Sequence, residues 1–398
     1  MTDTAIPIID VDSHLTEPID LWTSRMTGKW ADLAPRPIWD ERYGRNRWHI
    51  GNYRLLGTQD QNHSGWKEFF PSMPRIEDEG DPGAFDPRSR LQRLDQFGIA
   101  AQVLYPNLLG FFPYAFMSIG TEAATRCVQV FNDFQVEWCS ADPKRLIPLA
   151  YLPFWDVDAA VAELGRCSEL GYKGFNWGHG FEKIGLPPMR DPHWDPVLNL
   201  AQDLQMPASF HIGFGSVDHN TINQITGLYE ANYSPEDTQE QDLLQAQLGV
   251  LLFLGNATVI TELCMLGVCH RFPGLKFVSI ESGFGYVPFL LEAMDWQYKN
   301  NRGAQSLKSL PLPSEYFRRQ VYATFWFERN TLKLLDYGLV DNLMFESDYP
   351  HGTSLSPGPG STAVSPRDTA ARNLAELPPA VRRKLLHDTA ARVYNLEV

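Results

Sequence analysis

Eight short apolar runs recur along this 398-residue chain, and a helical pattern separates each run from the next. The runs are apolar almost without a break, which is typical of parallel strands that are covered on both faces. They span residues 6–12, 101–105, 146–152, 172–176, 208–212, 275–281, 321–324 and 342–347. Eight evenly spaced alternations predict an α/β chain folded as a (β/α)₈ barrel. A doubly wound sheet is the alternative, but it does not readily take eight strands in this spacing.

The segments between the strands predict the barrel's helices and two insertions. Helical patterns cover residues 88–97, 122–139, 157–170, 196–204, 242–271, 285–296 and 329–337, with two or three more between residues 365 and 394. Without repeats or a clear break, we expect residues 1–398 to form one domain. The insertions, residues 16–85 after the first strand and 214–241 after the fifth, would lie on the active-site face of a barrel. There they could form lids or subunit contacts.

Charge and cysteine content exclude some classes of partner and site. A net charge of -14 argues against a nucleic-acid partner, because phosphate binding requires clustered Lys and Arg. The five cysteines form no C-x-x-C pair, so we expect reduced thiols rather than a disulfide framework. The first residues carry no signal-peptide pattern, and the most apolar stretch, residues 248–254, is too short to cross a membrane. These features predict a soluble cytoplasmic protein without a membrane partner.

Polar side chains with metal-binding potential follow the predicted strands. They are Asp10, Asp12 and His14 after strand one, His211 after strand five, Glu281 after strand six, and Asp348 with His351 after strand eight. The carboxyl ends of barrel strands meet at one face, so these groups should converge there. Imidazoles and carboxylates gathered in one cleft would be desolvated and mutually repelled without a cation. The sequence therefore predicts a divalent metal, and mixed nitrogen and oxygen ligands suit Zn²⁺, Mn²⁺ or Fe²⁺.

Five motifs carry a resemblance to a known family. They are Ile-Asp-Val-Asp-Ser-His-Leu-Thr-Glu-Pro, Phe-His-Ile-Gly, Arg-Phe-Pro-Gly-Leu-Lys-Phe, Glu-Ser-Gly-Phe-Gly and Phe-Glu-Ser-Asp-Tyr-Pro-His, in this order along the chain. The chain thereby resembles the amidohydrolase superfamily, in particular its amidohydrolase-2 branch. That branch includes aminocarboxymuconate-semialdehyde decarboxylase and the γ-resorcylate-type decarboxylases. Because the motifs run from one end of the chain to the other, the resemblance covers essentially all of it.

The resemblance implies a set of metal ligands and shows two departures from the branch. It makes Asp12 and His14 the ligands of strand one, His211 that of strand five and Asp348 that of strand eight. Relatives often have His-x-His or Glu-x-His at strand one, whereas this chain has Asp12 in the first position. Several of the decarboxylases have a His after strand six, where this chain has Glu281. Glu281 could be a general acid or base, a ligand that bridges to a second metal, or a group that orients a ligand.

Further residues could complete the site. Glu17 offers an extra carboxylate in the first loop, and His63 lies in the first insertion, where it could close over the cleft. His179 follows strand four, and His351 stands next to Asp348. Aromatic residues that could line a pocket at the barrel mouth are Tyr105, Phe111, Phe112, Trp177, Phe284 and Trp326. The chain has no Gly-rich phosphate loop and no G-x-S-x-G elbow.

Three functions fit these residues. The first is a metal-dependent hydrolase or decarboxylase of a small organic acid, a class that includes aromatic acids, with Zn²⁺ as the expected metal and Glu281 and Asp348 as the catalytic groups. The second is an oxygen-dependent hydroxylase with a dinuclear Fe or Fe/Mn site, because oxygen donors favour these metals. The third is a metal-stabilised, non-catalytic partner subunit. For the enzyme we expect a homo-oligomer or an association with a paralogous subunit.

Overall fold

Eight parallel strands form the centre of the protein. The computed structural model describes residues 6–178, 180–213, 239–307 and 309–397. The central strands are β1 (Ile8–Leu15), β5 (Ile99–Pro106), β6 (Leu146–Pro148), β7 (Phe175–Asn176), β8 (Ala208–His211), β9 (Phe277–Ile280), β10 (Val321–Phe325) and β11 (Leu343–Phe345). Neighbours along the chain pair in two sheets, one running from β1 through β5 to β6 and the other from β7 to β11.

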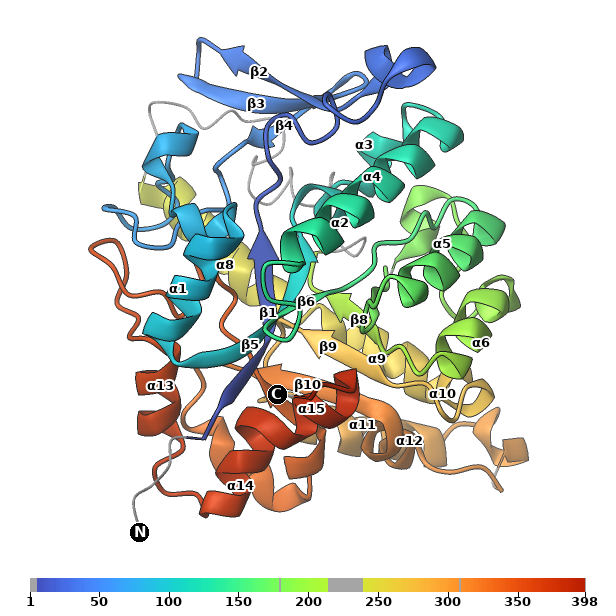
Figure 1. The fold of residues 1–398 in the computed structure, drawn as a ribbon. Helices are drawn as coiled ribbons and strands as arrows, with labels where there is room; N and C mark the ends of the chain where they lie inside the picture. Colours follow the sequence, from blue (N-terminus) through green and yellow to red (C-terminus); the bar gives the residue numbers. More distant parts are fainter. Residues whose placement is uncertain (1–5, 179, 214–238, 308, 398) are drawn as a thin grey trace.

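Two isolated parallel bridges close these sheets into a barrel. Ala150, just beyond β6, pairs with Phe175 of β7, and Ser13 of β1 pairs with Tyr349, just beyond β11. Each sheet edge therefore meets the edge of the other sheet, and the strands follow one another around the barrel in chain order (Figure 1). The predicted (β/α)₈ barrel is confirmed.

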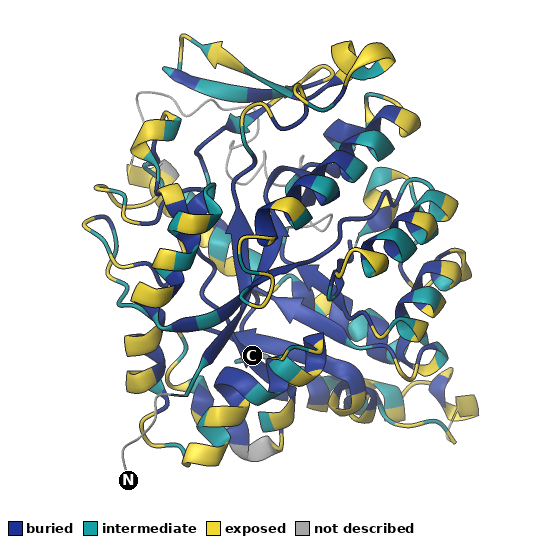
Figure 2. Cartoon of the chain, viewed as in Figure 1, coloured by how far each residue is buried: buried dark blue, intermediate teal, exposed yellow. Residues whose placement is uncertain are grey.

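Helices surround the barrel and bury their inner faces against it (Figure 2). The longer ones are α1 (Pro87–Phe97), α4 (Thr121–Cys139), α5 (Val157–Glu169), α6 (Asp195–Asp203), α9 (Asn256–Met265), α11 (Val287–Lys299), α12 (Pro313–Gln320) and α13 (Pro366–Asn373). The start and end of α1 follow from its sequence: the Asp86 side chain accepts from the Ser89 amide at 2.6 Å, and Gly98 ends the helix at φ 74°.

Two helix predictions are wrong in detail. The helix expected over residues 242–271 is divided into α8 (Gln239–Phe253), α9 and α10 (Val268–Arg271). Gly267 separates α9 from α10 at φ 90°, a left-handed conformation that interrupts a helix. The helix expected over residues 329–337 is a 3₁₀ helix, Thr331–Tyr337. Apolar periodicity predicted the buried faces, but it did not resolve these interruptions.

The segment between β1 and α1 contains an antiparallel sheet that the sequence did not predict. Its strands are β2 (Arg36–Asp40), β3 (Arg45–Ile50) and β4 (Tyr53–Gly57), in that order. Figure 1 shows this sheet beyond the end toward which β1 points, on the side of the strands' carboxyl ends. A role as a lid or subunit contact stays a prediction. The second insertion, residues 214–241, lies almost wholly outside the described residues.

One helical stretch, Asp242–Met265, is long and apolar enough to cross a membrane by length and composition, and 33% of its most apolar window is buried. A single stretch of this kind decides little, because core helices of soluble proteins pass the same test. The expected cytoplasmic location, without a membrane partner, therefore stays a prediction.

Asn256, at the start of α9, forms hydrogen bonds to both β8 and β9 near their carboxyl ends. Its buried side-chain nitrogen donates to Phe210 O at 3.2 Å, Ser279 Oγ at 3.0 Å and Ile280 O at 3.0 Å. Asn256→Ala should lower the free energy of unfolding by about 2–4 kcal/mol, because it leaves buried acceptors without a donor. Urea unfolding measures this loss. The control is Asn300→Ala, which removes one exposed hydrogen bond to Trp296 O; an equal loss in both variants would contradict the prediction.

Candidate metal centre

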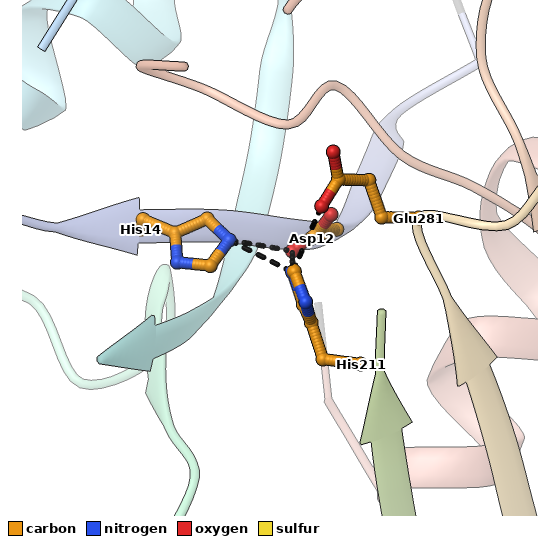
Figure 3. Close-up of side chains that lie close together, drawn as sticks. All are labelled: Asp12, His14, His211 and Glu281. Carbon is orange, nitrogen blue, oxygen red and sulfur yellow. Dashed lines mark hydrogen bonds and ion pairs between the residues drawn. The ribbon is translucent and has the colours of Figure 1, made fainter. Parts of the chain in front are cut away.

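Four side chains from three strands converge at the carboxyl ends of the barrel. Asp12 and His14 lie in β1, His211 ends β8, and Glu281 directly follows β9. All four are buried, and each offers a potential ligand atom within 4.8 Å of the others. Figure 3 shows their side chains pointing toward one another. The structure thus brings together four of the five residues that the sequence indicated as metal ligands.

The hydrogen bonds of the two histidines determine which ring nitrogen faces the cluster with a lone pair. His14 Nδ1 lies 3.3 Å from Pro106 O, and His211 Nδ1 lies 2.7 Å from Ile212 O. A carbonyl oxygen can only accept, so each Nδ1 carries the hydrogen and each neutral ring presents a lone pair at Nε2. The two Nε2 atoms are 2.9 Å apart. Two lone pairs at this distance repel each other unless a cation lies beside both.

Asp12 completes a donor set that fits such a cation. Its Oδ1 lies 3.5 Å from His14 Nε2 and 3.6 Å from His211 Nε2. Both carboxylate oxygens are buried and accept no hydrogen bond from the residues that the structure describes. An ionised carboxylate without partners is costly to bury, whereas a metal ion would compensate its charge. The donors of this centre therefore fit Zn²⁺, Mn²⁺ or Fe²⁺.

Asp348, the fifth predicted ligand, borders the same centre. Its Oδ1 lies 2.8 Å from His351 Nδ1 and 3.9 Å from His14 Nε2. The Thr353 hydroxyl donates to Asp348 Oδ2 and lies 3.4 Å from Glu281 Oε1, so it connects the two carboxyl groups. His14, Glu281, Asp348 and His351 form a second, overlapping group of potential ligands within 4.8 Å of one another. His351, expected only as a possible addition, is thus part of this cluster.

Two of the carboxyl-bearing residues have an unfavourable backbone conformation. Glu281 has φ 55° and Asp348 has φ 57°, and only Gln205 and Asn395 share a positive φ among the described non-glycine residues. A left-handed conformation costs roughly 1–2 kcal/mol for a residue with a Cβ atom. Such conformations concentrate at functional sites, where the surrounding structure enforces them. This supports a functional role for the turns after β9 and β11.

Burial and crowding shift the protonation of this centre. Burial raises the pKa of Glu281 well above its ordinary value, and the charges of Asp348 and Asp12 raise it further. Burial, together with His351 and His211, lowers the pKa of His14 well below its ordinary value. In the metal-free protein, burial and the neighbouring carboxylates therefore favour the protonated form of Glu281. His14 is neutral, as a metal ligand must be.

Three other predicted residues are placed differently. Glu17 is buried and its Oε1 accepts from the backbone amides of Asn107 at 3.0 Å and Leu108 at 2.7 Å, so it orients the loop after β5. His63 Nε2 lies 3.0 Å from Glu68 O within the first insertion. Neither belongs to the two groups of potential ligands. His179 lies outside the described residues. Roles for these three in the site stay predictions.

Thr353 and Phe111 contribute to the site but had little or no signal in the sequence. Thr353 lies in a Gly/Ser/Pro-rich loop, where its position depends on how the loop folds. Phe111, the last residue of α2 (Leu108–Phe111), was only one of several aromatic candidates. Its ring centroid lies 5.6 Å from that of His211, 6.0 Å from that of His14 and 6.3 Å from that of His351. It therefore forms an apolar wall beside the donors.

The stability of the metal-free protein should fall as the pH rises from about 5 to about 8. Burial raises the pKa of Asp10 from 3.8 to about 7, so between about pH 5 and pH 7 this group is ionised in the unfolded chain but largely protonated in the folded protein. Stability is therefore lost with rising pH, by about 2–3 kcal/mol from this group between pH 5 and pH 8. Thermal unfolding of chelator-treated protein measures the effect, and Asp10→Asn should flatten the profile. A melting temperature that rises over this range would contradict it.

The match to a family model decides the family. The amidohydrolase model, Amidohydro_2, matches residues 9–396, which include every residue of the cluster. The chain belongs to the amidohydrolase family. This confirms the resemblance that the five motifs indicated. It also agrees with the expected class of metal-dependent hydrolase or carbon–carbon lyase.

Curated relatives and solved structures of this amidohydrolase carry more specific names. The chain is 23% identical over 342 residues to 2-amino-3-carboxymuconate-6-semialdehyde decarboxylase of Dictyostelium discoideum, with 84% of this chain and 80% of the relative covered. It is 25% identical over 276 residues to γ-resorcylate decarboxylase of Rhodococcus jostii, with 66% and 76% covered. A 5-carboxyvanillate decarboxylase of Novosphingobium aromaticivorans, solved with manganese and 4-hydroxy-3-methoxy-5-nitrobenzoic acid, superposes with a TM-score of 0.67 at 15% identity, with 100% and 98% covered.

Proposed function

We propose that this amidohydrolase is a metal-dependent decarboxylase of a small aromatic carboxylic acid. The observation that supports a metal requirement is the 2.9 Å distance between the facing Nε2 atoms of His14 and His211. The reaction class is supported by the relatives, since those from Dictyostelium discoideum and Rhodococcus jostii are both named decarboxylases. The wall that Phe111 forms beside the histidines suits a flat, apolar ring.

The residues of the cluster would have two roles in this reaction, metal binding and proton transfer. Asp12, His14 and His211 would hold the metal, with Glu281 or Asp348 as a further ligand. A bound divalent cation supplies positive charge that attracts the anionic oxygens of the substrate. As the bond to the carboxyl carbon breaks, its electron pair stays on the ring carbon and CO₂ leaves. In its protonated form, Glu281 would give its proton to that carbon, become a carboxylate and be reprotonated by water.

Elemental analysis of protein purified without added metal tests which metal the protein binds. The sequence favours Zn²⁺, whereas the carboxylates of Asp12 and Glu281 also suit Mn²⁺. We expect about one divalent ion per chain for the decarboxylase. Protein without any bound divalent ion, and without affinity for added Zn²⁺ or Mn²⁺, would contradict the proposal.

The reaction itself is tested with γ-resorcylate and 5-carboxyvanillate on metal-loaded protein. We expect release of CO₂ and, in D₂O, one deuterium at the carbon that carried the carboxyl group. Chelation should abolish the release. A metal-saturated protein that releases no CO₂ from aromatic acids but cleaves amides or esters would instead be a hydrolase.

The overlapping ligand group favours a second candidate, the oxygen-dependent hydroxylase with two metals. Beyond the His14 and Glu281 that it shares with the first set, this group adds the carboxylate of Asp348 and the imidazole of His351, and both donor types suit iron and manganese. Two metals per chain including iron, with activity lost under anaerobic conditions, would support it over the decarboxylase. A complete donor set argues against a non-catalytic partner subunit. The expected homo-oligomer or paralogous association stays a prediction, measured by light scattering.

A further inference from the structure

Arg90 of α1 is a buried cation that forms no ion pair with the residues that the structure describes. Its side chain is fully buried. Its guanidinium instead donates to Gly83 O, to His14 O and to Gln102 Oε1, and it lies 4.4 Å from the centre of the Tyr349 ring. Burying a charge without a counter-ion costs several kcal/mol unless hydrogen bonds compensate. The positions of these bonds indicate what the charge does.

One bond reaches a predicted metal ligand directly. Arg90 Nη2 donates to His14 O at 2.5 Å. The amide of the same residue, His14 N, donates to Tyr349 O at 2.6 Å. The backbone of His14 is therefore held on one side by α1 and on the other by the turn that follows Asp348.

A second bond begins a path to two further predicted ligands. Arg90 Nη1 donates to Gln102 Oε1 at 3.1 Å, which leaves Gln102 Nε2 to donate to Asp10 Oδ2 at 2.7 Å. Asp10 Oδ1 accepts from Asp12 N at 3.2 Å and from Ser347 N at 2.8 Å. Every group on this path is buried. The path ends at the amide of Asp12 and at the residue that precedes Asp348.

We propose that Arg90 is a positioning residue of the metal centre. It acts directly on the His14 carbonyl, and through Gln102 and Asp10 on the backbone of Asp12 and of the turn that carries Asp348. Because Arg90 can only donate, the Gln102 side chain must present its oxygen to Arg90 and its nitrogen to Asp10. The guanidinium therefore fixes which atoms donate and which accept in these hydrogen bonds. The inference rests on the proposed metal centre and does not depend on the substrate.

Three substitutions and one control test this role. Arg90→Met removes the charge and its hydrogen bonds, Gln102→Met interrupts the path while Arg90 remains, and Arg90→Lys keeps the charge. Arg93→Met is the matched control, because Arg93 lies on the same helix but pairs with Asp81 at 2.9 Å. The dissociation constant for Mn²⁺ is measured by titration calorimetry of the full chain, and the free energy of unfolding by urea.

We expect Mn²⁺ binding to weaken by about 10–100-fold in Arg90→Met and Gln102→Met, as when a group that orients a ligand is lost. Arg90→Lys should recover part of this loss, and Arg93→Met should stay within about threefold of wild type. A variant with both Arg90→Met and Gln102→Met should bind Mn²⁺ no more weakly than the single variant with the lower Mn²⁺ affinity, because both changes break the same path of hydrogen bonds.

A merely structural Arg90 would lower the stability of the fold and leave Mn²⁺ affinity unchanged in the folded fraction. If Arg90→Met does not fold, Gln102→Met decides: wild-type Mn²⁺ affinity in a folded Gln102→Met variant overturns the proposal. Mn²⁺ binding requires no turnover. A wild-type protein that binds Mn²⁺ but decarboxylates nothing would therefore disprove the proposed reaction and leave the role of Arg90 standing.

Discussion

His14→Ala is expected to weaken divalent-cation binding by more than about 100-fold and to abolish activity. Loss of a group that only orients a ligand costs about 10–100-fold in metal affinity, and loss of the ligand itself should exceed that range. His14 belongs to both groups of potential ligands and is the only imidazole that they share, so its loss leaves each group incomplete. Titration with Mn²⁺ and elemental analysis of the purified variant measure the effect.

His193→Ala is the matched control for this substitution. His193 is exposed and lies beside Trp194, and it belongs to neither group of potential ligands. It should bind Mn²⁺ as the wild type does. If His14→Ala also bound Mn²⁺ within about threefold of wild type, the metal centre described above would be wrong.

Glu281→Gln is expected to lower kcat by about 10²–10⁴-fold, the range for loss of a general acid. Glutamine keeps the shape of the side chain and one oxygen donor but has no acidic proton to give. If Glu281 acts as the acid, Mn²⁺ affinity should change by less than about tenfold while turnover collapses. If it is mainly a ligand, affinity and turnover should fall together. Steady-state kinetics and Mn²⁺ titration on the same preparation separate the two roles.

Glu328→Gln provides the control for this experiment. Glu328 is also a carboxyl group whose pKa is raised by burial, and it accepts from the amides of Trp326 and Phe284. A glutamine oxygen can still accept such bonds, so turnover should stay near the wild-type rate. Equal losses of turnover in both variants would show that the effect of Glu281→Gln comes from packing rather than from proton transfer.

The barrel could be predicted from the sequence because each strand is a local apolar run of nearly uniform character. The predicted starts and ends of these runs differ by a few residues from the strands observed, as at residues 172–176, where only Phe175–Asn176 form β7. The helices after residue 242 were predicted as one because apolar periodicity continues across Gly267. The sheet of β2, β3 and β4 was missed because its strands are short and half-exposed, without the alternation that indicates a strand.

The convergence of Asp12, His14, His211 and Glu281 could be predicted from the rule that carboxyl ends of barrel strands share one face. The path from Arg90 to Asp10 could not, because an arginine in an amphipathic helix normally lies at the surface. Gln102 likewise looks like an ordinary polar residue within a strand. Their roles depend on which groups lie opposite them across the barrel wall, and no local pattern encodes that.

The pairing of β1 with the turn after β11 has a consequence for how the protein is made. Asp348 N donates to Asp12 O at 3.0 Å, and His14 N donates to Tyr349 O. These bonds join residues more than three hundred positions apart, so they contribute strongly to contact order and should form late in folding. During synthesis the amino-terminal ligands leave the ribosome long before Asp348 exists. We therefore expect stable metal capture only after residues 348 and 349 have been synthesised, and chains that stop before residue 348 to emerge without bound metal.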